Sequence, residues 1–206
     1  MAPVLVGEAG HEAIERMNAL GILVDLSHCG RRTAADAIAA SRRPVAFTHT
    51  GCAALVEHPR HRTDAEMKSV AATGGVVGIF VMPYLAKGRQ PVAADVVAHL
   101  EHALDVAGED HVSIGTDGTV SPTVLTPKFV RQFAENNRKR RERGIAAPYE
   151  TAEGYLFASD LNTPRRFETL AGLLLARGHG EARVEKILGG NLARVFAEAW
   201  QPASGA

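Results

Sequence analysis

Cysteine is scarce in this sequence, which has only two among its 206 residues. That number excludes a small fold built on a framework of disulfides. Cys29 directly follows His28, and Cys52 comes shortly after His49. This placement permits metal binding or redox chemistry, but small buried cysteines are more common, and we expect that both are of this kind.

Aromatic residues are also few, at 5% of the chain, whereas Ala, Val, Leu and Gly abound. This composition favours a parallel sheet of branched aliphatic side chains that is covered by helices. The chain lacks an excess of either charge as well, since 23 Lys and Arg balance 23 Asp and Glu. We therefore expect neither nucleic acid nor an anionic membrane surface as its main partner.

Long hydrophobic runs are absent too, because no stretch of about 18 apolar residues occurs. The sequence therefore predicts no membrane span. Residues 1–10 lack a basic segment followed by an apolar core, so we expect no secretory signal and a cytoplasmic location. The one basic cluster, at 138–143, has a helical pattern and contains Glu142, which predicts a solvated helix face.

Short apolar runs alternate with helical patterns along the chain. The predicted strands are 22–27, 44–49, 76–81 and 112–117. The predicted helices are 8–20, 33–40, 63–72 and 92–107, followed by a long polar helix that ends near Arg143 and by two or three closing helices. This alternation is typical of βαβ units and a parallel sheet. Four such units are half of an eight-fold barrel, which typically needs about 250 residues.

Three of the predicted strands end in residues that can bind a metal. His28 and His49 end the first two strands, 21 residues apart, and Asp117 ends the fourth. The carboxyl ends of parallel strands meet at one edge of a sheet, where ligands and metals bind. Neutral imidazoles and a carboxylate suit a catalytic zinc. The alternative is that these histidines are hydrogen-bonded structural residues.

Other polar residues indicate a function less specifically. Arg60 lies in the loop after the second strand, where a guanidinium can grip a substrate carboxylate, although a solvated loop is the alternative. Asp25 lies within an apolar strand, so we expect it to face a helix end or to pair with an arginine. His99 and His102 lie on one predicted helix with no evident partner, and we expect both at the surface.

Five segments, in the same order, resemble those of one metallopeptidase family. They are MNALGILVDLSH (17–28), SRRPVAFTH (41–49), HPRHRTD (58–64), GGVVG (74–78) and GGNLARVF (189–196). Together they resemble the membrane (renal) dipeptidase family, peptidase family M19, and the resemblance extends over nearly the whole chain.

The resemblance implies an α/β fold that is the C-terminal half, about strands 5 to 8, of a metal-dependent-hydrolase TIM (β/α)8 barrel, with C-terminal helices after it. Residues 1–206 would form a single partial barrel domain. The resemblance also implies a zinc-dependent dipeptidase that hydrolyses its dipeptide substrate through a metal-bound hydroxide.

The matching segments imply a role for four residues. His28 and His49 correspond to the two histidines that hold the second of two zinc ions. Arg60 corresponds to the arginine that grips the substrate near its carboxylate. Asp117 corresponds to the aspartate that hydrogen-bonds the metal-bound water and moves its proton.

Parts of the family's two-zinc site have no counterpart in this chain. The bridging glutamate, the ligands of the first zinc (a His-x-Asp pair) and a further substrate-binding histidine are expected upstream of Met1. Around Asp117 the chain has one acidic residue, where many members have Asp-Phe-Asp-Gly. The resemblance thus implies an active site that is incomplete in this chain and needs a missing N-terminal half.

Two alternatives from other classes stay open. One is a catalytically inactive half-barrel remnant or binding module that associates with itself, as in a homodimer, through open sheet edges. The other is a mononuclear amidohydrolase-like enzyme whose metal is held by His28, His49 and Asp117.

Overall fold

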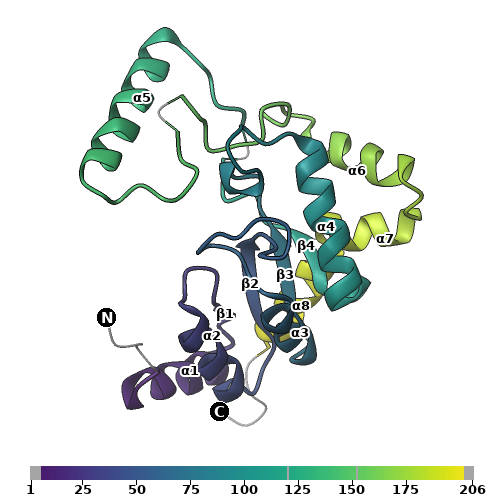
Figure 1. Cartoon of the computed structure of the whole chain (residues 1–206). Coiled ribbons are helices and arrows are strands. Elements are labelled where there is room, and N and C mark those ends of the chain that lie inside the picture. The colour runs from purple at the N-terminus through teal and green to yellow at the C-terminus, as the bar shows by residue number, and fades with distance from the viewer. Residues whose placement is uncertain (1–5, 120, 152, 202–206) are drawn as a thin grey trace.

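The computed structural model describes residues 6–119, 121–151 and 153–201. These residues contain a sheet of four parallel strands in the order β1-β2-β3-β4, so each strand pairs with its neighbour in the sequence. The strands are β1 (Val24–Asp25), β2 (Val45–Thr50), β3 (Val76–Ile79) and β4 (Val112–Ile114). The predicted parallel α/β architecture is confirmed (Figure 1).

Helices connect the strands and follow the last one. Up to β4 they are α1 (Glu8–Leu20), α2 (Arg31–Ala40), α3 (Asp64–Ala72), the 3-10 turn η1 (Pro83–Leu85), α4 (Ala93–Ala107) and the 3-10 turn η2 (Glu109–His111). After β4 they are α5 (Pro127–Glu142), α6 (Arg166–Ala176), α7 (Glu181–Glu185), the π turn η3 (Lys186–Gly190) and α8 (Asn191–Ala199). The helices match the predicted pattern, whereas β1, β3 and β4 are shorter than the strands predicted there.

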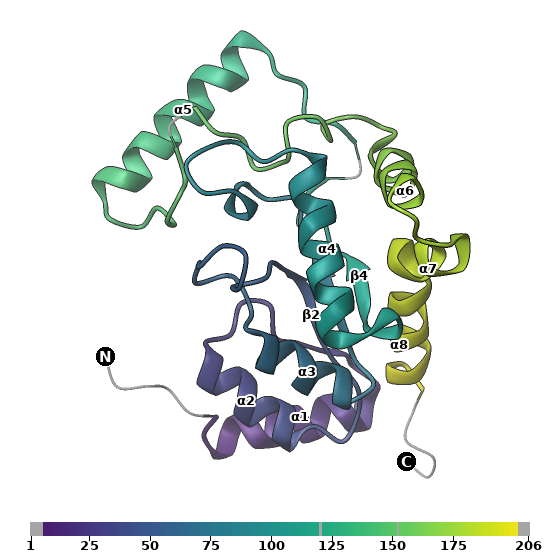
Figure 2. The same cartoon turned by 45° about the vertical axis from the view of Figure 1, so that its right-hand side comes forward.

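The two faces of the sheet pack against different helices. Val45 and Phe47 are fully buried in a large core that includes residues of α3 and α4. Ala46 points to the opposite face, because side chains alternate along a strand. It is buried with Val76 and with Val195 of α8 in a second, small cluster. Figure 2 shows α1, α2 and α3 together on one side of the molecule and α6, α7 and α8 on the other.

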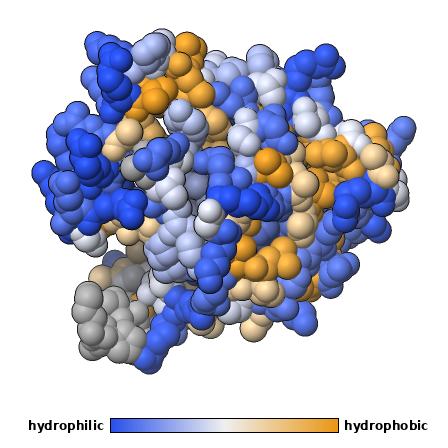
Figure 3. All heavy atoms as spheres, turned by 45° about the horizontal axis from the view of Figure 1, so that its top comes forward, coloured by the Kyte–Doolittle hydropathy of each residue, from blue (hydrophilic) through white to orange (hydrophobic). Residues whose placement is uncertain are grey.

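Helix α5 extends away from the sheet, and none of its residues is buried (Figures 1 and 2). On it, Arg138 and Lys139 form ion pairs with glutamates one turn away. The basic cluster is thus a solvated helix face, as predicted. In Figure 3, strongly hydrophilic side chains predominate on the left of the view, and hydrophobic side chains form several separate patches on this face. No helix in the described part of the chain is long and apolar enough to cross a lipid bilayer.

Strand β2 contains a bulge near its carboxyl end. Its register against β3 shifts between Phe47 and Thr50, so β2 has one residue more than β3 there. The carbonyl oxygen of Thr48 occupies space that two glycines leave free. A Cβ on Gly78 would lie 2.0 Å from this oxygen, and a Cβ on Gly115 would lie 1.7 Å from it. The bulge, which redirects neighbouring side chains, therefore depends on glycine in the two adjoining strand segments.

Candidate metal and substrate site

The structure brings His28, His49 and Asp117 together at the carboxyl edge of the sheet. His28 lies exposed on the turn after β1, and His49 lies half-buried near the end of β2. Their Nε2 atoms are 2.9 Å apart. Asp117, which follows β4, has its Oδ1 atom 4.0 Å from Nε2 of His49. The strand-end rule therefore predicted correctly that these three side chains share one edge.

Asp117 has an unusual backbone conformation. Its φ of 52° lies in the left-handed region, which disfavours most residues other than glycine. Aspartate tolerates this region better than most residues, because its short polar side chain can bond locally. Such conformations are common at functional sites, where the surrounding structure maintains them. The turn after β4 thus aims the carboxylate toward His49.

Asp25 is the centre of a hydrogen-bond network, and the prediction of its partners was wrong. Among the residues that the structure describes, it pairs with neither an arginine nor the end of a helix. Its carboxylate accepts hydrogen bonds from the backbone and hydroxyl of Ser27 (3.0 and 2.6 Å) and from those of Thr48 (3.2 and 2.6 Å). Partial burial alone would raise the pKa of Asp25, but these hydrogen bonds outweigh it and lower the pKa below its usual value.

This network sets the tautomer of His49. The Thr48 hydroxyl donates its hydrogen to Asp25, so its oxygen accepts a hydrogen bond from Nδ1 of His49, at 2.8 Å. Nδ1 therefore carries the proton, and the lone pair of Nε2 faces His28. A histidine that binds a metal commonly has its second nitrogen held in this way. One signal was in the sequence, because an aspartate side chain commonly accepts hydrogen bonds from the residue two positions further on, which here is Ser27.

The electrostatic surroundings keep His49 neutral. Burial disfavours the charged imidazolium and lowers the pKa of His49, and Arg60 and His28 act in the same direction. Asp117 and Asp25 oppose this effect without reversing it. The neutral form is the one that can bind a metal.

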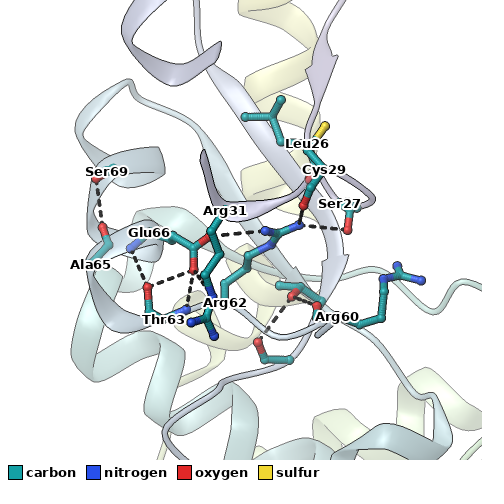
Figure 4. A network of polar contacts seen from close by, with 12 residues as sticks. Leu26, Ser27, Cys29, Arg31, Arg60, Arg62, Thr63, Ala65, Glu66 and Ser69 are labelled. Carbon is teal, nitrogen blue, oxygen red and sulfur yellow. Dashed lines mark hydrogen bonds and ion pairs between the residues drawn. The ribbon is translucent and has the colours of Figure 1, made fainter. Parts of the chain in front are cut away.

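Arg60 lies near this edge with an unpaired guanidinium. Its Nε and Nη2 atoms are buried and have no hydrogen-bond partner among the described residues. Its backbone is fixed, since the N–H donates to Nδ1 of His58 (3.1 Å) and the carbonyl accepts from the hydroxyl of Thr50 (2.8 Å). Buried N–H groups usually have partners. Two unpaired donors on one guanidinium are therefore suited to an anionic ligand. Figure 4 shows Arg60 extending from the loop that follows β2.

Three other histidines are internal and have structural partners. His58 donates from Nε2 to the carbonyl of Pro148 (3.1 Å), and His61 donates from Nδ1 to that of Val56 (2.6 Å). His99 accepts at Nδ1 from the backbone N–H of Cys52, at 2.9 Å. The prediction of a surface position was therefore wrong for His99, which is 1% exposed.

Two of these buried histidines make the protein sensitive to acid. Burial lowers the pKa of His61 to about 3 and that of His99 to about 4. The unfolded chain protonates both near the ordinary pKa of about 6.5, so it binds more protons than the folded state below that pH. We expect the free energy of unfolding to fall from pH 6.5 toward pH 4, by up to about 1.4 kcal/mol per pH unit for each histidine. Urea unfolding at pH 7, 6 and 5 measures this free energy. The variant His61→Asn should reduce the slope of the free energy of unfolding against pH. An unchanged slope would contradict the expected role of His61.

The two cysteines behave largely as expected. Cys52 is completely buried, and this burial raises the pKa of its thiol to about 12, which keeps it protonated. Cys29 is partly buried, and burial raises the pKa of its thiol as well. Neither thiol is activated for nucleophilic or redox chemistry.

A surface cavity of about 430 Å³ opens elsewhere, between α1 and the segment that leads into β2. Its lining includes Asn18, Arg42 and Arg43. The guanidinium of Arg43 already has partners there, because it donates to three backbone carbonyls at the end of α8 and just beyond it. This cavity lies at the amino end of β2, so it is not an extension of the histidine site.

Comparison with known proteins identifies the family. A family model described as membrane dipeptidase (peptidase family M19) matches residues 6–126. The chain is 29% identical over 187 residues to dipeptidase verJ of Clonostachys rogersoniana, a match that covers 91% of this chain and 40% of that protein. It is 38% identical over 111 residues to an uncharacterised dipeptidase of Schizosaccharomyces pombe, which covers 52% of this chain and 27% of that protein.

Solved structures agree on the fold. An amidohydrolase from Pseudomonas aeruginosa is 31% identical, with a TM-score of 0.77 over 94% of this chain and 57% of that one. A metallopeptidase from Rhodobacter sphaeroides, solved with a phosphinate mimic of the dipeptide L-Ala-D-Ala, has a TM-score of 0.71 over 94% of this chain and 47% of that one. At 21% identity the latter shows likeness of fold alone.

The chain spans roughly half the length of these solved relatives. Its four βα units correspond to about half of their (β/α)8 barrel, with further helices after them, as the sequence predicted. The family model covers more than half of the chain, including the segments that carry His28, His49, Arg60 and Asp117. This chain belongs to the membrane dipeptidase family, peptidase family M19.

Proposed function

We propose that this chain carries the part of a dipeptidase active site that binds one zinc ion and the substrate carboxylate. The observation that carries the proposal is the 2.9 Å approach of the Nε2 atoms of His28 and His49 beside Asp117. Two imidazole nitrogens this close together are suitable ligands for one zinc ion. Membership of a metallopeptidase family supports this chemistry.

The residues present fit one zinc ion in part. His28 and His49 would be its protein ligands, and Thr48 holds His49 in the tautomer that leaves Nε2 free to bind. Across the described ranges, no group of three or more His, Cys, Asp or Glu side chains is arranged to hold a metal ion. The mononuclear alternative therefore gains no support, and the remaining ligands of a two-zinc site would have to come from a preceding half-barrel.

Each proposed residue has a defined task in dipeptide hydrolysis. A bound zinc ion would polarise the peptide carbonyl and the attacking water. Arg60 would hold the substrate carboxylate with its open Nε and Nη2 donors, through two parallel hydrogen bonds. Asp117 would accept a proton from the attacking water on a carboxylate oxygen and return it to the leaving amine.

The role of Arg60 is tested by substrates with and without a carboxylate. Activity is measured first on this chain alone and on the chain extended upstream, and the variants are made in the form that is active. We expect Arg60→Lys to raise KM for a Gly-containing dipeptide at least about 10-fold, because lysine cannot make the two-pronged contact. The C-terminal amide of the same dipeptide lacks the carboxylate, so its KM should change little. An equal effect on both substrates would contradict the proposed role.

The role of Asp25 is tested through zinc affinity. In Asp25→Asn the amide has one oxygen where the carboxylate has two, so it cannot accept from both Ser27 and Thr48 as before. Thr48 is then free to reorient, and His49 loses its fixed tautomer. We expect zinc affinity, measured by isothermal titration, to fall about 10- to 100-fold. Asp36→Asn, a change on helix α2, is the matched control, and equal affinities of the two variants would contradict the assignment.

A further inference from the structure

Arg62 lies two residues after Arg60 and is completely buried, at 1% exposed. The backbone around it is fixed, because its N–H donates to the carbonyl of Gly51 (2.9 Å) and its carbonyl accepts from the N–H of Ala53 (2.9 Å). A buried guanidinium is costly unless its N–H groups are paired. The hydrogen-bond partners of the Arg62 guanidinium therefore indicate its role.

One nitrogen of Arg62 binds the turn that carries His28. Nη2 lies 2.9 Å from the carbonyl oxygen of Leu26, 3.1 Å from that of Ser27 and 2.8 Å from that of Cys29. These acceptors precede and follow His28 in the chain. Figure 4 shows the guanidinium of Arg62 reaching from its own loop to this turn. The turn that presents His28 is therefore held from outside its own strand.

A second nitrogen of the guanidinium is anchored on the core side, whereas Nε is buried without a hydrogen-bond partner among the described residues. Nη1 donates to Oε1 of Glu66 at 3.2 Å, and the guanidinium carbon lies 4.4 Å from the centre of the Phe47 ring. Glu66 is fixed in turn, because its other oxygen accepts from the backbone N–H and the hydroxyl of Thr63, both at 2.9 Å. The start of α3, Arg62 and the His28 turn thus form one connected network, drawn in Figure 4.

The same loop presents both arginines to different targets. Arg60 has two donors without a partner among the described residues, whereas Arg62 donates to the turn of His28. We propose that Arg62 is a positioning residue, which fixes the His28 imidazole relative to His49 and to the Arg60 guanidinium. The substrate-binding loop and the zinc-binding turn then move as one unit. This inference rests on the proposed function and adds to it a residue outside the predicted site.

The test compares Arg62→Lys with Arg31→Met in the 206-residue chain. Lysine keeps the charge but has a single nitrogen, so it cannot reach three carbonyls and Glu66 together. Arg31→Met removes another cation near Glu66, 3.8 Å from Oε2, and leaves the His28 turn untouched. Thermal unfolding and circular dichroism establish that both variants fold, and Arg62→Gln serves as a second variant if the lysine variant does not fold.

Two readouts separate positioning from stability. The first is the affinity for Zn²⁺ by isothermal titration, which we expect to fall 10- to 100-fold in Arg62→Lys and to change less than twofold in Arg31→Met. The second uses the metal-free chain: imidazole ¹⁵N NMR signals report the contact between Nε2 of His28 and Nε2 of His49, and Arg62→Lys should disperse or shift them.

Each outcome decides the inference. If Arg62→Lys only lowers the unfolding temperature, with unchanged imidazole signals, the residue is merely structural and the inference is wrong. If those signals shift but neither His28→Ala nor His49→Ala alters zinc affinity, the positioning role stands and the proposed zinc site fails. If the histidine variants lose zinc and Arg62→Lys does not, only the inference fails.

Discussion

Gly115→Ala is expected to destabilise the protein by about 3 kcal/mol or more and to disrupt the histidine pair. The new Cβ would lie 1.7 Å from the carbonyl oxygen of Thr48, 2.8 Å from its carbonyl carbon and 3.3 Å from Cα of His49. These are backbone atoms, so the clash cannot be relieved by rotating a side chain. The bulge of β2 would have to move, and His49 would move with it. Urea unfolding and zinc titration of the variant measure the two effects.

Gly172→Ala is the matched control for this substitution. Gly172 lies in α6, and a Cβ there would meet no atom within 4 Å outside the neighbouring backbone of its own helix. Alanine favours a helix over glycine, so we expect this variant to be equally stable or up to about 1 kcal/mol more stable, with unchanged zinc affinity. If Gly115→Ala behaved like Gly172→Ala, the bulge would not depend on glycine, and the account of how His49 is placed would be wrong.

His49→Ala is expected to lower zinc affinity by at least about 100-fold, more than the loss of an orienting partner typically costs. It removes one of the two nitrogens that meet 2.9 Å apart, and it leaves Thr48 and Asp25 without the imidazole that they hold. His28→Ala should have a similar effect on zinc but should leave the Asp25 network intact. Isothermal titration with Zn²⁺ measures both.

His102→Ala is the control for adventitious zinc binding. His102 is partly exposed and pairs with Asp64 at 2.8 Å, on helices away from the proposed site. Its removal should leave the tightest zinc-binding event unchanged. If His102→Ala reduced zinc binding as much as His49→Ala, zinc would bind to surface histidines and the proposed site would be wrong.

Much of the fold follows from local patterns in the sequence. The alternation of apolar runs and helical stripes predicts the four strands in their order. The predicted start of the helix at Thr63 is confirmed, because Thr63 and Glu66 form a capping box there. Strand lengths were less predictable, because they depend on pairing between strands. β1 pairs at Val24 and Asp25 alone, and the bulge in β2 depends on glycines that lie 30 and 67 residues beyond Thr48.

The site was predictable only where a strand-end rule applies. That rule places His28, His49 and Asp117 at one edge, and the structure brings them together. The bonds of Asp25 to Thr48 were missed, because they depend on the register of β1 against β2. The burial of Arg62 could not be predicted from the sequence, since a charged residue in a loop is usually solvated. Its burial here depends on backbone carbonyls from another segment.

The burial of His99 was also missed, although a signal was present. His99 stands next to Leu100 on α4, a helix in which six residues between Ala93 and Ala103 are buried. The surface position was predicted because no partner for His99 is evident in the sequence. In the structure both ring nitrogens of His99 have backbone partners, which makes its burial affordable.

Anomalous diffraction at the zinc edge, from crystals of this chain grown with Zn²⁺, tests the central claim most directly. The proposed function predicts a zinc ion at about 2.0 to 2.1 Å from Nε2 of both His28 and His49. A zinc ion bound elsewhere, with these two nitrogens still facing each other in an ordered and metal-free pair, would contradict it.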